Sequence, residues 1–263
     1  MLRLFLEVAL APALVAASTL ASRRWGSQAG GVVSALPVVI GPVLLITAQQ
    51  SGAEAAKRAA TATLLGLVAM GAFVAAYGRL ARRAGWGASL AGGWVATLAL
   101  AALAAVGRHW GLAISAAAAL VSLGGALAIL PSAQHRDDPA ALVERRVGLA
   151  KRMVITTALV ALLAIAVRAL GPQIGGVLAA LPVLGSVLAV FAHRGEGAKG
   201  AVCFLRGLAS GMVGFIAFCA TVAVLIVPAG TFVSFVAASA AAVLLQAVAL
   251  RGRTPRAFGA ARA

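Results

Sequence analysis

Long apolar runs separated by short polar segments make up most of the chain. A helix needs roughly 20 mostly apolar residues to cross a bilayer, and nine runs approach that length. They cover residues 4–22, 31–49, 59–78, 88–107, 111–131, 153–170, 174–192, 203–225 and 230–250. The polar stretch from Pro131 to Arg152 is too short to form a separate domain. The pattern predicts an all-α polytopic transmembrane bundle of about nine helices, forming a single domain over residues 1–263.

Composition excludes a water-soluble globular protein, because 62% of the residues are hydrophobic and only 11% are charged. The 22 Lys and Arg residues outnumber the 6 Asp and Glu residues. These cations lie in short clusters between apolar runs, which is typical of membrane loops and not of a nucleic-acid-binding face. Cys203 and Cys219 lie in the same apolar run, so the sequence predicts no disulfide framework and no metal site.

The distribution of the cations predicts an orientation in the membrane. Positive residues gather in cytoplasmic loops. If the N-terminus is outside, seventeen of the 22 Lys and Arg residues fall on the cytoplasmic side and five fall on the other. We therefore expect the N-terminus outside and the C-terminus in the cytoplasm.

An internal repeat links two distant parts of the chain. Residues 23–38 align with residues 168–183 in the pattern R-x-x-G-x-Q-x-G-G-V-x-x-A-L-P-V, with ten of sixteen positions identical. The offset of 145 residues continues without a gap, so that Gly52 aligns with Gly197 and Phe73 with Phe218. This match indicates a duplication.

The offset of the repeat spans five predicted helices, which is an odd number. The second copy is therefore expected to cross the membrane in the opposite direction. Repeat A would cover residues 4–107 and repeat B residues 153–251, joined by a linker helix and cytoplasmic loop over residues 108–152. Inverted repeats with a binding site near the midplane are a recurring plan of secondary transporters.

The repeated motif contains polar and helix-breaking residues that could line a pathway. Pro37 and Pro182 lie near the middle of their runs and remove the helical partners of the Val33 and Leu178 carbonyls. In lipid such carbonyls need another donor, a water-filled cavity or a ligand. Ordinary proline kinks and small-residue packing are the structural alternative. The predicted pathway residues are Gln28, Gly30, Gly31, Val33, Pro37, Gln173, Gly175, Gly176, Leu178 and Pro182.

Three charged residues have two interpretations each. Arg23 and Arg168 precede the two motif copies from opposite membrane faces and could contact an anion or a lipid head group near a helix N-terminus. The alternative is that both side chains snorkel to the interface. Glu7 is a candidate proton carrier or an interfacial carboxylate.

Several function classes lack a visible site in the sequence. None of the six acidic residues lies at the middle of a predicted helix, where proton-driven pumps usually carry ionisable residues. The sequence has no phosphate-binding loop, no H-E-x-x-H and no G-x-S-x-G motif. We therefore expect a protein that is not an enzyme and that needs no metal or other cofactor.

The segment Gly-Gly-Val-x3-Leu-Pro, followed fifteen residues later by Gly52-Ala53-Glu54-Ala55 or Gly197-Ala198-Lys199-Gly200, resembles the GlpM-like family of small bacterial membrane proteins. The chain would be similar to two fused copies, with Lys199 in place of Glu54 in the second. The resemblance implies a bacterial inner-membrane location. It covers about thirty residues in each half.

Three function classes remain open. The inverted repeat favours a transporter or permease for a small solute. The paired arginines and the absence of deep acids fit a lipid-handling protein instead, such as a flippase or an envelope-biosynthesis scaffold. An intramembrane enzyme or assembly factor is the third class. The expected partners are membrane lipids and a small-molecule or lipid substrate but no nucleic acid, and the sequence leaves a homo-oligomer open.

Overall fold

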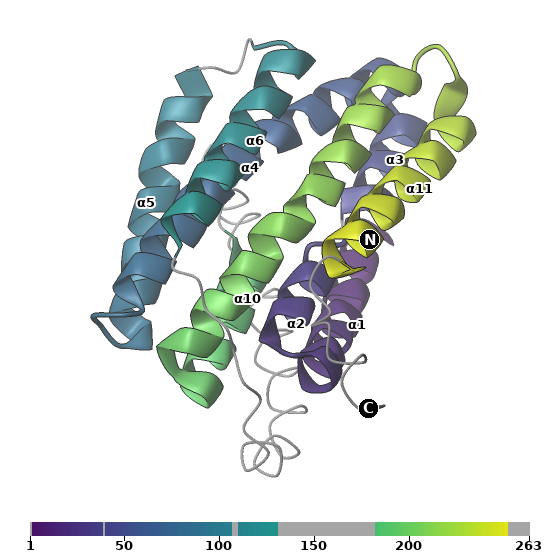
Figure 1. The fold of residues 1–263 in the computed structure, drawn as a ribbon. Coiled ribbons are helices and arrows are strands. Elements are labelled where there is room, and N and C mark those ends of the chain that lie inside the picture. The colour runs from purple at the N-terminus through teal and green to yellow at the C-terminus, as the bar shows by residue number, and fades with distance from the viewer. Residues whose placement is uncertain (1, 39, 107–109, 131–181, 252–263) are drawn as a thin grey trace, which may run out of the picture.

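The computed structural model describes residues 2–38, 40–106, 110–130 and 182–251. Eight helices and no strand are found in this part of the chain (Figure 1). The helices are α1 (Leu2–Trp25), α2 (Ser27–Ser34), α3 (Ile40–Ser51), α4 (Ala53–Leu80), α5 (Trp86–Val106), α6 (Leu112–Ile129), α10 (Val183–Leu225) and α11 (Gly230–Arg251).

Helix α10 forms the centre of the bundle. On one side it packs against α4, α6 and α5, and on the other side against α2 and α11, while α1 packs mainly on α2. Figure 1 shows this arrangement, with α4, α5 and α6 on the left of α10 and α1, α2 and α11 on its right. Side chains from both groups therefore converge on α10.

Single glycines connect several of the helices directly. Gly52 joins α3 to α4 with φ 87° and ψ 170°, and Gly197 divides α10 into two helical parts with φ 68° and ψ −167°. A side chain with a Cβ rarely adopts this backbone conformation, whereas glycine adopts it freely. The chain can therefore leave one helix and enter the next within one residue.

Helix ends recur along the chain at the offset of the sequence repeat. Adding 145 to the bounds of α4 (53 and 80) gives 198 and 225, the residue after Gly197 and the last residue of α10. The same addition places the end of α3 (51) at 196, just before Gly197. It also moves α5 (86–106) to 231–251, next to the observed α11 (230–251).

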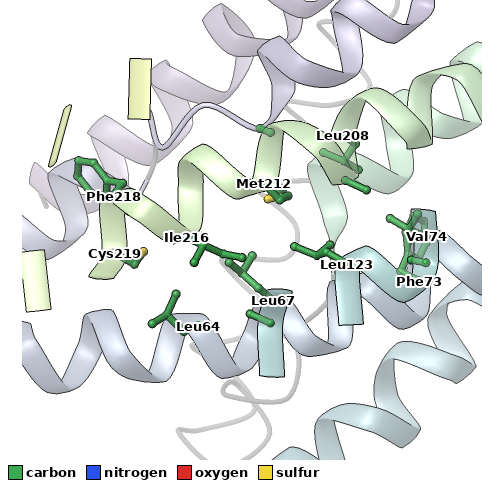
Figure 2. Packing of buried hydrophobic residues seen from close by; sticks show 14 of the residues in the cluster. Leu64, Leu67, Phe73, Val74, Leu123, Leu208, Met212, Ile216, Phe218 and Cys219 are labelled. Carbon is green, nitrogen blue, oxygen red and sulfur yellow. The ribbon is translucent and has the colours of Figure 1, made fainter. Parts of the chain in front are cut away.

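The hydrophobic core lies mainly between α4 and the second part of α10. Figure 2 shows Leu64 near Cys219 and Leu67 near Ile216. At the other end of the pair, Gly78 of α4 lies close to Leu205. Residue numbers thus rise along α4 as they fall along α10, and the two helices run antiparallel.

Four of the described helices are long and apolar enough to cross a membrane, namely α4, α6, α10 and α11. Helix α5 is apolar over Trp86–Ala102. The expected all-α membrane architecture is confirmed at this level. The expected gap between the runs 203–225 and 230–250 is also confirmed, because a turn at 226–229 divides α10 from α11.

The described residues form eight helices, and their bounds depart from the nine expected runs in two places. The run 31–49 is not one helix: Pro37 cannot donate a backbone hydrogen bond, and α2 ends at Ser34 before α3 begins at Ile40. The runs expected at 174–192 and 203–225 contribute to one element, α10, bent at Gly197. The run 153–170 lies outside the described residues.

Candidate functional site at the break between α2 and α3

The break at residues 35–38 interrupts an apolar segment inside the bundle. The amide of Ala35 bonds to the carbonyl of Val32 at 3.1 Å, and the amide of Leu36 bonds to that of Val33 at 3.2 Å. The Val33 carbonyl, which was expected to need another donor because of Pro37, has one in the Leu36 amide and is not free to line a pathway. The last turn of α2 tightens, so a residue three positions later supplies the donor that the proline lacks.

The carbonyl of Ala35, at the break, accepts a hydrogen bond from a distant part of the chain. The side-chain amide of Gln246 in α11 donates to it at 3.2 Å and to the carbonyl of Gly211 in α10 at 3.4 Å. Gln246 is 5% exposed. One buried amide thus connects α11, α10 and the end of α2, and it satisfies a backbone group that lipid could not.

The glycines of the motif permit close packing on both sides of α2. A Cβ on Gly31 would collide with the backbone carbonyl of Phe204 in α10, and one on Gly30 would collide with Ser22 in α1. The hydroxyl of Ser18 in α1 donates to the Gly30 carbonyl at 2.8 Å. In the part of the chain that the structure describes, these two glycines contact helix backbones.

Gln28 lies half-buried in the first turn of α2, and its backbone carbonyl packs against Gly207 of α10. The preceding residue, Ser27, donates a hydrogen bond to the carboxylate of Glu196. Glu196 precedes the Gly197 bend, so this bond ties the start of α2 to the junction between the two parts of α10.

Polar side chains also connect other helices around α10. The guanidinium of Arg206 donates to the carbonyls of Leu130 at 2.7 Å and Leu127 at 3.4 Å, at the C-terminal end of α6. A cation at this end satisfies exposed carbonyls and suits the helix dipole. In α4, the hydroxyl of Tyr77 lies 3.3 Å from Nδ1 of His193.

The second copy of the motif is only partly described. Pro182 is buried and immediately precedes α10, where its carbonyl accepts a hydrogen bond from the Ser186 amide at 2.7 Å. The predicted residues Arg168, Gln173, Gly175, Gly176 and Leu178 lie outside the described residues. Arg23 lies in the last turn of α1, and Glu7 lies nearer the start of that helix.

Sequence reasoning missed the polar side chains that bond to the motif, namely Gln246, Glu196 and Ser18. Gln246 has no polar counterpart in the other half, because Ala101 occupies the aligned position. In the sequence, Gln246 was recognisable only as a single amide residue inside the apolar run 230–250. Glu196 was counted only among the acids that lie away from the middle of a predicted helix, although it lies one residue before the glycine at which α10 bends. The described residues contain no group of three or more potential metal-ligating side chains.

We compared the chain with protein-family models, with curated proteins and with solved structures. None of these comparisons gave a match, so the assignment of a function depends on the geometry of the break itself.

Proposed function

We propose that this protein is a secondary transporter for a small solute in the bacterial inner membrane. The observation that carries the proposal is the discontinuous pair α2 and α3, whose internal end presents the Ala35 carbonyl to the amide of Gln246. Broken helices in membrane transporters place backbone carbonyls at the substrate site. Irregular backbone at membrane depth is tolerated where protein covers it or where it lines a cavity.

Two inverted repeats form the frame of the proposed transporter. Three observations support them: the repeated helix ends, the shared conformation of Gly52 and Gly197, and the antiparallel packing of α4 on α10. Helices related by an axis in the membrane plane run in opposite directions, whereas an axis along the membrane normal would keep them parallel. The N-terminus is then outside and the C-terminus in the cytoplasm, as the cation distribution predicts.

The chemistry of the break indicates what kind of solute it would take. The C-terminal end of a helix carries a partial negative charge on its last carbonyls. The end of α2 therefore favours cations and hydrogen-bond donors, and Gln246 supplies such a donor. A solute that bonds to the Ala35 carbonyl would replace this amide. We propose a small amine or inorganic cation as the substrate class.

Purified protein in liposomes, subjected to concentration jumps on a solid-supported membrane, tests this function. The solutes applied are alkali cations, ammonium, methylamine and guanidinium. Chloride, sulfate and phosphate are applied for comparison. We expect a protein-dependent current for at least one cation or amine. The flux should fall in Pro37→Ala and Pro182→Ala but persist in Pro228→Ala, since Pro228 lies exposed in the turn between α10 and α11.

Two outcomes would contradict the proposal. Undiminished flux in both motif variants would mean that the prolines shape only the packing. If none of the applied solutes moves while a fluorescent phospholipid crosses the same liposomes, the protein handles lipid instead.

A further inference from the structure

The C-terminal end of α1 carries two adjacent arginines, Arg23 and Arg24, beside a hollow in the surface. A hollow of about 520 Å³ is lined there by Ala17, Leu20, Ala21, Arg23, Arg24, Trp25 and Val33. The volume falls within the range of small-ligand sites, about 300–1,000 Å³. It is formed by residues from the last two turns of α1 and by one residue of α2.

The lining of this hollow has a large apolar part and a small cationic part. Leu20 is 56% exposed and Ala17 is also exposed, so apolar surface faces outward beside the buried Ala21. Arg23 and Arg24 follow within one turn, and no acidic residue is among the lining residues. A ligand that fits both parts has an apolar chain and an anionic end.

The order of these residues along α1 matches the layers of a membrane. The apolar residues lie toward the middle of the helix, and the arginines form its last turn. Trp25 is 68% exposed, and the guanidinium carbon of Arg24 lies 5.8 Å from the centre of its ring. Tryptophan favours the interface between lipid head groups and hydrocarbon, and arginines there attract anionic lipids.

We propose that this hollow binds an anionic phospholipid. The phosphate contacts Arg23 and Arg24, and one acyl chain lies along Leu20 and Val33. A free inorganic anion would use only the cationic part and would leave the apolar lining uncovered. The binding is separate from transport and does not depend on the function of the α2–α3 break.

Native mass spectrometry of the full-length protein in detergent tests the site. Wild-type protein, titrated with phosphatidylglycerol or phosphatidylcholine of equal chain length, should retain phosphatidylglycerol on the order of tenfold better. The double variant Arg23→Gln, Arg24→Gln should lose this preference. The matched control is Arg82→Gln, Arg83→Gln, since these exposed arginines follow α4, and it should keep the preference.

A second variant keeps the charges and fills the space. Ala17→Phe should lower phosphatidylglycerol binding severalfold while Arg23 and Arg24 remain, and thermal unfolding of each variant checks that it is folded. Equal retention of both lipids by wild type, or retained preference in the double arginine variant, would overturn the proposal. Complete displacement of the lipid by millimolar inorganic phosphate would assign the site to a free anion and overturn it as well.

Discussion

The side-chain amide of Gln246 donates a hydrogen bond to the backbone carbonyl of Ala35, which lies 211 residues earlier in the chain. The bond holds the unwound end of α2 against α11, and the same amide reaches the Gly211 carbonyl of α10. This one side chain thus joins three helices at the break. The stability of the break should therefore depend on this amide.

Replacing Gln246 by leucine should lower the free energy of unfolding. An interhelical hydrogen bond in a membrane protein contributes about 0.6 kcal/mol on average and up to about 1.7 kcal/mol, so we expect a loss of about 1–2 kcal/mol. Thermal unfolding in detergent measures the change. Gln49→Leu is the control, because Gln49 is exposed near the end of α3 and its loss should leave the midpoint nearly unchanged. Equal midpoints for Gln246→Leu and wild type would refute the structural role of the amide.

Gly31→Ala should be more damaging than the size of a methyl group suggests. Its Cβ would overlap the Phe204 carbonyl and lie 2.6 Å from the Leu208 nitrogen, so α2 and α10 would have to separate. Overpacking of this kind costs about 1–3 kcal/mol. The control is Gly66→Ala in α4, where nothing lies within 4 Å of the added carbon, and which should stabilise the helix by up to about 1 kcal/mol. Chemical denaturation should show a lower free energy of unfolding for Gly31→Ala and a higher one for Gly66→Ala than for wild type.

Arg206→Met should loosen the C-terminal turn of α6. The guanidinium donates to the Leu127 and Leu130 carbonyls, and hydrogen bonds to charged groups contribute about 1.5–3 kcal/mol. Faster hydrogen exchange at the end of α6, compared with its middle, is the expected result. The exposed Arg79 at the end of α4 provides a control, Arg79→Met, which should leave that exchange unaltered. If the Arg206→Met variant exchanges at the wild-type rate, the arginine does not cap α6.

Cysteine labelling tests the inverted orientation of the two repeats. Glu54 and Lys199 occupy aligned positions 145 residues apart, one residue into their helices, and both are exposed. A membrane-impermeant thiol reagent should label Glu54→Cys in intact cells and Lys199→Cys only after permeabilisation. The native Cys203 and Cys219 are buried, and wild type serves as the background control. Labelling of both variants from the same side would exclude inverted repeats.

Reporter fusions provide an independent test of the orientation. Fusions after Arg83, Arg146 and Arg256 should report the cytoplasm, and fusions after Arg58 and Arg168 should report the outside, because of the cation asymmetry. An external signal after Arg146 would contradict both the orientation and the odd number of helices between the repeats.

Hydrophobic run length was sufficient to predict the helical membrane architecture, since α5, α6 and α11 follow the expected runs within two residues at each end. It failed where a run contains a residue with special backbone chemistry. Pro37 ends α2 and splits one expected helix, whereas Gly197 bends α10 without adding a loop. Run length measures apolar surface and carries no information on backbone torsion.

The candidate site was predictable only in outline. The repeated motif located the break, but the donor to its carbonyl comes from Gln246, more than two hundred residues away and without a repeated counterpart. Pairings of this kind depend on how helices dock, so they follow from tertiary packing and not from the pattern along the chain.

The glycine contacts of α2 with α10 have a consequence for motion. Where backbone lies directly on backbone, as at Gly31 and Gly207, there are no side chains that could change rotamer to let the helices slide. These two helices must move as one rigid body. Between α4 and α10 the contact is made by leucine, methionine and isoleucine side chains, which can slide past one another by small rotations. A conformational cycle that sheared along that aliphatic surface would displace α4, α5 and α6 against α10, and it would have to break the bonds of Arg206 to the end of α6 and the Tyr77–His193 contact.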